Sequence, residues 1–263
     1  MQILLVIGLV GAVATFVDSI IGMGFGVLST SLLMTSGVYP AVASASVHVG
    51  KVVTGSLSGG AHLWFGNVKK EWLLPLALPG VIGGSAGAYL LASLPGKEMK
   101  PYVAGILLVL GLVILHRFVF RRTSPDILLQ AEDTIDPAPK RKVSKLPLLG
   151  FVAAFVDAIG GGGWGPIATP GLILTGKEEP HKVIGTVNIA EVFAAIAISA
   201  TFIATLGMKA LPWNQVAALM VGGMISAPTG AYLCKRLPTR ALGILTALAL
   251  IVFNLWIIIG TLS

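Results

Sequence analysis

Five ionisable residues lie inside otherwise apolar stretches of the sequence, and they are the first candidates for chemistry: Asp18, His48, Lys51, Asp157 and Glu191. If these stretches cross a membrane, an unpaired charge at the centre costs at least about 2.5 kcal/mol on insertion scales. Each group therefore needs a partner or a water-filled cavity. Ionisable residues held in this way mark substrate pathways and proton relays.

Two of these residues correspond to each other when the two halves of the sequence are aligned on a shared proline. Lys51 then matches Glu191, and His48 matches Asn188. Each half spaces its pair three residues apart, which places both side chains on one helix face. We expect this face to bind substrate through His48, Lys51 and Asn188. The alternative is a buried Lys51–Glu191 ion pair that fixes the halves together.

Two glycine-rich segments, tip 1 (20–26) and tip 2 (159–165), interrupt the apolar pattern. Glycine lets the backbone approach a ligand closely, and a helix that starts after each tip points N–H groups and partial positive charge back at it, which suits an anion. The alternative is that the glycines only allow helices to pack closely. The predicted substrate-binding residues at the tips are Gly22, Gly24, Phe25, Gly26, Gly161, Gly163, Trp164 and Gly165.

Polar residues near these segments have simpler interpretations beside the functional one. Asp18 and Asp157 precede their tips, where a carboxylate either caps loop N–H groups or, with Glu191, couples transport to protons. Four threonines (Thr30, Thr54, Thr169 and Thr186) could offer hydroxyl donors, although membrane threonines usually bond their own helix. His62 falls at the end of an apolar block and is expected to be interfacial.

Composition indicates a membrane protein. Hydrophobic residues make up 55% of the 263 residues and charged residues 11%, whereas soluble domains carry about 25% charged residues. The net charge of +7 comes from Lys and Arg in the connections between apolar blocks, which is typical of topology determinants rather than of a nucleic-acid-binding face. One cysteine excludes a disulfide framework within the chain. We predict no metal and no cofactor.

Six long apolar blocks are predicted to be helices of membrane-spanning length. A polar stretch, 120–146, cannot bury enough apolar surface to fold alone and is interpreted as a cytoplasmic linker. It separates a first membrane repeat, 1–119, from a second, 147–263. The predicted blocks are 41–61, 72–93, 101–119, 183–206, 213–234 and 240–260.

The halves are repeats of one another. Residues 16–30 align without gaps onto 155–169 with eight identities in fifteen positions, and 80–95 onto 223–238 with eight in sixteen. The identities include an aspartate, three alternating glycines and a Gly-Ala-Tyr-Leu string. Apolar similarity alone does not keep such residues in register, so the sequence indicates an internal duplication.

Two topologies compete for the glycine-broken segments 1–36 and 147–176. If each crosses once, every half has four spans and the repeats are parallel, with ten Lys and Arg facing in and seven out. If each is a re-entrant hairpin, every half has three full spans and the repeats are inverted, with fourteen inside and three outside. The positive-inside rule favours the inverted model. The predicted fold is therefore an all-α polytopic membrane protein of two inverted repeats, each a re-entrant hairpin plus three transmembrane helices.

The chain resembles the TauE/SafE sulfite exporter family, also called the toluene sulfonate uptake permeases. The resemblance rests on the duplicated Phe-Val-Asp-x-Ile-x-Gly-x-Gly-x-Gly motif, the Gly-Ala-Tyr-Leu…Leu-Pro repeat, the length and the polar centre, and it covers essentially the whole chain. It implies a multi-pass protein of the plasma membrane, usually the bacterial inner membrane, that moves sulfur-containing anions such as sulfite or organosulfonates. Only the glycines of the two tips are carried over as family residues.

The sequence therefore predicts a secondary carrier of a small anion, with protons as a candidate coupling ion and the lipid bilayer as its surroundings. Inverted repeats with broken helices place such a site at mid-depth. An anion channel would use the same site. A membrane-embedded enzyme would need a nucleophile and a base at depth, and His48 is the only histidine well inside an apolar block. The identity of the anion, the direction of transport and the oligomeric state are left open.

Overall fold

The computed structural model describes residues 2–120, 145–173, 178–236 and 239–262, and this part of the chain is helical, with two 3₁₀ turns. Most of the predicted linker, 121–144, lies outside the described residues. The first half contains α1 (Gln2–Ile21), α2 (Phe25–Thr35), α3 (Pro40–Trp64), α4 (Leu73–Ala92) and α5 (Gly96–Phe120). The second contains α7 (Leu146–Gly160), α8 (Trp164–Ile173), α9 (Pro180–Leu206), α10 (Trp213–Leu233) and α11 (Thr239–Leu262).

Within these ranges six helical segments are long and apolar enough to cross a membrane. Five of them match predicted blocks, while the sixth is α1, which the sequence analysis assigned to a broken segment. The predicted block 41–61 does form a long helix, α3, of 25 residues. It is too polar to be counted among the six because it carries buried serines, His48 and Lys51 on faces that neighbouring helices cover.

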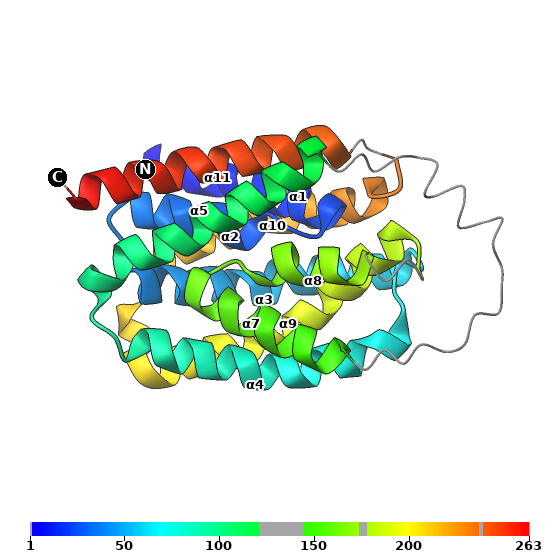
Figure 1. The fold of residues 1–263 in the computed structure, drawn as a ribbon, viewed down its shortest axis with the longest axis horizontal. Helices are drawn as coiled ribbons and strands as arrows, with labels where there is room; N and C mark the ends of the chain where they lie inside the picture. Colours follow the sequence, from blue (N-terminus) through cyan, green and yellow to red (C-terminus); the bar gives the residue numbers. More distant parts are fainter. Residues whose placement is uncertain (1, 121–144, 174–177, 237–238, 263) are drawn as a thin grey trace.

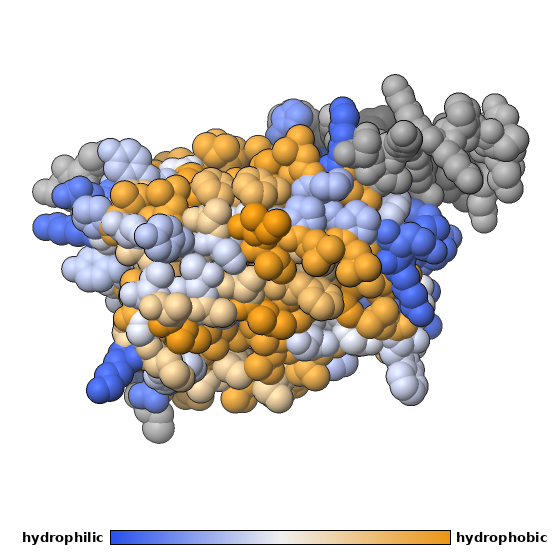
Figure 2. All heavy atoms as spheres, turned by 90° about the horizontal axis from the view of Figure 1, so that it is seen from below, coloured by the Kyte–Doolittle hydropathy of each residue, from blue (hydrophilic) through white to orange (hydrophobic). Residues whose placement is uncertain are grey.

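The outer surface agrees with a membrane setting. On the face that Figure 2 shows, apolar residues form a band across the middle, and hydrophilic residues gather at the two ends. The exposed large side chains of the outer helices include Leu78, Ile82, Ile225 and Ile259. Such exposure is unfavourable in water, but it places hydrocarbon against lipid when the helices span a bilayer. The chain is a multi-pass membrane protein.

The first helix of each half packs against a helix of the other half. Helix α1 packs along α10 and α7 packs along α4, so the first helix of each half lies against the other half (Figure 1). These contacts are close because of glycine: a Cβ on Gly11 would lie 2.8 Å from the Leu219 carbonyl oxygen, and one on Gly87 would lie 2.6 Å from that of Phe155. Small residues at these crossings allow the backbones to approach as they do in other membrane helices.

Helices α3 and α9 pack against each other in the middle of the molecule, and α2 and α8 are the short helices that follow the two tips. Helix α8 begins at Trp164, within tip 2 rather than after it, so that Pro166 lies in its first turn. The difference has a simple reason, since the first turn of a helix has no internal acceptors for its N–H groups and so tolerates proline. These four helices, together with the ends of α1 and α7 that carry Asp18 and Asp157, position the candidate site.

Candidate functional site

Lys51 is shared by two carboxylates, one from each half of the chain. Its Nζ lies 2.5 Å from Asp18 Oδ2 and 2.9 Å from Glu191 Oε2. The side chains of Lys51, Asp18 and Glu191 are 3%, 7% and 9% exposed. The predicted alternative of a Lys51–Glu191 ion pair is therefore present, and it extends to Asp18. Lys51 is not a free cation here, because the two carboxylates hold two of its three N–H donors.

His48 pairs with the aspartate of the opposite half. Its Nε2 lies 3.0 Å from Asp157 Oδ2, and its Nδ1 lies 2.8 Å from the Ser44 carbonyl oxygen. A carbonyl can only accept, so Nδ1 carries a hydrogen. The contact with Asp157 then contains one proton, which sits either on His48, giving an imidazolium and a carboxylate, or on Asp157, giving a neutral pair.

The two aspartates also cap the tips, as one of the two interpretations predicted. Asp157 Oδ1 accepts a hydrogen bond of 2.7 Å from the Gly163 N–H, and Asp18 Oδ1 accepts a longer one of 3.4 Å from the Phe25 N–H. Each aspartate therefore uses one oxygen to hold its tip and the other to hold a cationic partner. Capping and charge pairing are combined in the same side chain.

Tip 1 and tip 2 pack directly against each other. Gly22 and Gly161 have φ angles of +69° and +66°, which close the turns at the helix ends. Thr30 Oγ1 donates to the Gly161 carbonyl oxygen and Thr169 Oγ1 donates to that of Gly22, both at 2.9 Å. These threonines were expected to bond their own helices, and that expectation was wrong for this pair.

Thr54 and Thr186 do bond their own helices, through the carbonyl oxygens of Gly50 and Lys182. The difference follows from location, because only Thr30 and Thr169 face the opposite tip. The one sequence signal for their role was their alignment onto each other in the duplicated motif.

Several predicted glycines serve this close contact. A Cβ on Gly26 would lie 2.6 Å from Gly162 Cα, and one on Gly165 would lie 2.8 Å from Met23 Cα. The packing interpretation of the glycines is therefore what the geometry shows in this conformation, and their proposed contact with substrate stays a prediction.

The two aromatic residues at the tips are fully buried and differ in their contacts. The ring centroid of Phe25 lies 5.5 Å from Lys51 Nζ, within range of a cation–π interaction. Trp164 donates from Nε1 to the Val187 carbonyl oxygen at 3.0 Å. Phe25 thus lies beside the charged cluster, whereas the only polar atom of the Trp164 side chain is already engaged.

Asn188 occupies the position equivalent to His48 and lies at tip 1. Its Nδ2 donates to the Ile184 carbonyl oxygen at 3.1 Å and lies 3.5 Å from that of Asp18. Its Oδ1 is buried and has no hydrogen-bond partner in the described structure. The predicted face of α3 and α9 therefore does look at the two tips.

A hydrogen-bonded chain that the sequence analysis did not identify leads away from this cluster. His62 is buried rather than interfacial, and its Nε2 lies 3.0 Å from the Ser19 carbonyl oxygen. Asn67 Nδ2 lies 3.2 Å from His62 Nδ1. Nothing in the spacing of these residues links them, since Ser19 and His62 are 43 positions apart and come together only when α1 packs against α3.

The charges of the cluster do not balance when every group is ionised. Three carboxylates (Asp18, Asp157 and Glu191) face two cations (Lys51 and His48), which leaves one negative charge. An uncompensated charge at such depth is costly, so the cluster favours taking up one proton. The arrangement can therefore hold one proton. No group of three His, Cys, Asp or Glu side chains in the described ranges is arranged to hold a metal ion.

Comparison with known proteins gives two matches and one negative result. The family model "Sulfite exporter TauE/SafE" matches residues 7–257. The chain is 40% identical over 256 residues to the probable membrane transporter protein YtnM of Bacillus subtilis (strain 168). The aligned region covers 97% of this chain and 82% of that protein. No solved structure matches.

Proposed function

Because the chain belongs to the sulfite exporter TauE/SafE family of membrane transporters, we propose that it is a proton-coupled secondary carrier of a small sulfur-containing anion, such as sulfite or an organosulfonate, in the plasma membrane. The observation that carries the proposal is the buried cluster at the two tips, where one lysine is shared by two carboxylates. The family name supports the substrate class, and the cluster supports the coupling. A transport role, rather than an enzymatic one, accounts for both.

The proposed architecture is a pair of inverted repeats with re-entrant hairpins. Its support is that equivalent ends of α3 and α9 lie at opposite ends of the molecule. Tyr39, just before α3, packs against Gly96 at one end. Glu178, just before α9, binds Lys69 at 2.7 Å at the other end, which is also where Arg240 bonds the Phe118 carbonyl oxygen next to the predicted linker. We call this second end the linker end. Figure 1 shows α3 and α9 running in opposite directions.

An anion binds this cluster by replacing carboxylates at Lys51. In the described conformation Asp18 and Glu191 hold the ammonium group, so a substrate anion competes with them for its donors. Protonating a carboxylate removes its charge and frees the lysine for the substrate. Anion and proton thus favour each other's binding, which is the thermodynamic linkage that a symporter needs.

Glu191 is the proposed proton carrier. Asp18 binds both Lys51 and the Phe25 N–H, whereas among the described residues the Glu191 carboxylate binds only Lys51. A carboxylate that accepts fewer hydrogen bonds loses less stabilisation when it is protonated. Starting from a neutral cluster, a monovalent anion requires one proton to keep it neutral and a divalent anion requires two, so we expect the proton number to follow the substrate's charge.

The competing function is an anion channel, which would use the same cluster without coupling. Purified protein in liposomes distinguishes the two when sulfite, ethanesulfonate, a matched dicarboxylate and choline are each offered under an imposed pH gradient. We expect saturable sulfite or sulfonate uptake that the gradient drives above equilibrium, and we expect Glu191→Gln to transport only downhill. Anion flux that never exceeds equilibrium would identify a channel, and saturable choline flux without anion flux would contradict the proposal.

A further inference from the structure

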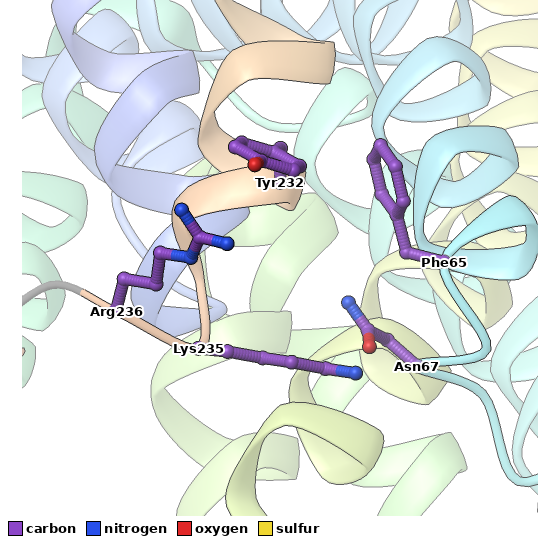
Figure 3. A pocket seen from close by; sticks show the side chains of 5 residues that line it. All are labelled: Phe65, Asn67, Tyr232, Lys235 and Arg236. Carbon is purple, nitrogen blue, oxygen red and sulfur yellow. The ribbon is translucent and has the colours of Figure 1, made fainter.

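A small pocket opens at the linker end, away from the charged cluster. It is lined by Phe65 and Asn67, which follow α3, and by Tyr232, Lys235 and Arg236 at the end of α10. Figure 3 shows Lys235 and Asn67 reaching toward each other across it from different elements. Its walls therefore combine two aromatic rings, two cations and one amide.

The two cations are available to a ligand. Neither Lys235 nor Arg236 forms an ion pair within the described ranges. The positive charge of Lys235 acts on Glu179, but Lys182 binds the Glu179 carboxylate at 3.2 Å. This hydrogen bond is the main reason that the pKa of Glu179 is lowered. Arg236 lies over the Tyr232 ring at 5.0 Å, and the Phe65 and Tyr232 centroids are 5.6 Å apart. Positive charge thus sits beside an apolar surface.

Asn67 contributes a buried atom that lacks a partner. His62 Nε2 must carry a hydrogen because its partner, the Ser19 carbonyl, can only accept. In a neutral ring Nδ1 then accepts from Asn67 Nδ2, which fixes the orientation of this amide. Asn67 is 1% exposed, and its Oδ1 has no hydrogen-bond partner in the described structure. The pocket therefore also offers a hydrogen-bond acceptor.

The equivalent position in the other half lacks the two cations. In the alignment of 80–95 with 223–238, Lys235 and Arg236 correspond to Ala92 and Ser93. Tyr232 corresponds to Tyr89, which is 63% exposed. The two cations are therefore specific to the second half and are not required by the duplication.

We propose that this pocket is an anion-binding vestibule, which takes an oxoanion that carries a small apolar group and a hydrogen-bond donor. The cations bind the anionic oxygens, the rings contact the apolar group, and Asn67 Oδ1 accepts from the donor. The chain Asn67–His62–Ser19 joins the vestibule to the residue that follows Asp18. The inference rests on the proposed function in taking the transported anion as the ligand, and it adds a capture site at the linker end.

The test measures thiol modification of the full-length protein in detergent, in a Cys234→Ser background. Phe65→Cys places a thiol in the pocket, and Trp64→Cys is the matched control, because Trp64 is at the same helix end, is 87% exposed and does not line the pocket. Each is treated with the anionic 2-sulfonatoethyl, the cationic 2-(trimethylammonium)ethyl and the neutral methyl methanethiosulfonate. We expect the anionic-to-cationic rate ratio to be about tenfold higher for Phe65→Cys than for Trp64→Cys.

Two further arms separate a built site from a generally basic surface. Lys235→Gln with Arg236→Gln should bring the ratio of Phe65→Cys to that of Trp64→Cys, while Lys97→Gln with Lys100→Gln should leave it unchanged. 2-Hydroxyethanesulfonate should slow the neutral reagent at Phe65→Cys more than ethanesulfonate does, and more than chloride at equal ionic strength. Unchanged neutral-reagent rates in the Gln variants control for folding.

Equal ratios at both cysteines, or equal protection by sulfonate and chloride, would overturn the vestibule. These outcomes are distinguishable from failure of the proposed function. Sulfonate protection with no anion flux in liposomes would contradict the carrier proposal, whereas anion flux without protection would contradict only the vestibule.

Discussion

The two repeats share a backbone but not their central chemistry. Both tips close with a left-handed glycine, Gly22 or Gly161, and both are held by a threonine of the opposite half at the same distance of 2.9 Å. The residues that face the tips differ, since His48 and Lys51 of the first half stand where Asn188 and Glu191 stand in the second. The repeats therefore have the same residues where their backbones pack together and different residues where charges must pair.

This comparison explains why the cluster can form at all. Two identical halves would bring two lysines or two glutamates together, and like charges at this depth would repel. By carrying a lysine in one half and a glutamate in the other, the chain makes an ion pair across its own duplication.

The largest expected effect is a reversal of labelling between equivalent positions. Tyr39→Cys and Glu179→Cys, which flank the matched prolines, are each made in a Cys234→Ser background and treated in intact cells with an impermeant thiol reagent. Inverted repeats place them on opposite sides, so Tyr39→Cys should react at once and Glu179→Cys only after permeabilisation. Parallel repeats place both outside, and labelling of both in intact cells would therefore eliminate the inverted model.

The next effect concerns the charge that the repeats do not share. Lys51→Met keeps the apolar stem but leaves Asp18 and Glu191 without their cation, and breaking a buried pair costs about 3–5 kcal/mol. We expect anion binding to weaken at least tenfold, with a clear loss of thermal stability. Adding Glu191→Gln should restore part of the stability, because Asp18 still lacks a partner, and should not restore binding. Wild-type binding in Lys51→Met would remove this residue from the site.

The smallest effect concerns the backbone that the repeats do share. Gly22→Ala and Gly161→Ala each place a Cβ at a positive φ, which costs about 1–2 kcal/mol, and against a threonine of the opposite half. We expect about 2–4 kcal/mol of destabilisation in each, measured by denaturation in detergent. Gly105→Ala, in α5 with nothing within 4 Å, is the control and should be neutral or slightly stabilising. A neutral result at one tip alone would show that the tips are not equivalent.

Much of this architecture could be read from the sequence. Five of the six predicted blocks are helices long and apolar enough to cross a membrane, and α3 begins and ends within one to three residues of its predicted block. An apolar run of about 20 residues has no better structure in lipid than a helix. The pairing of Lys51 with Glu191 was also predictable, since a repeat alignment puts them in equivalent places and a membrane requires a partner for each. The capping by Asp18 and Asp157 followed from their position before a glycine turn.

Other features were decided by tertiary packing alone. Three contacts depend on which helices lie side by side. Asp18 is the second carboxylate on Lys51, and His48 binds Asp157. Thr30 and Thr169 each bond the opposite tip. The same holds for the chain Ser19–His62–Asn67 and for the pocket beside it. The sequence by itself determined how many helices form and which residues need partners, because hydropathy and buried charge act locally. Apart from Lys51 with Glu191, the partners were decided by the tertiary structure. Contacts between the halves depend on how closely glycine lets the backbones approach, and helical periodicity does not encode that.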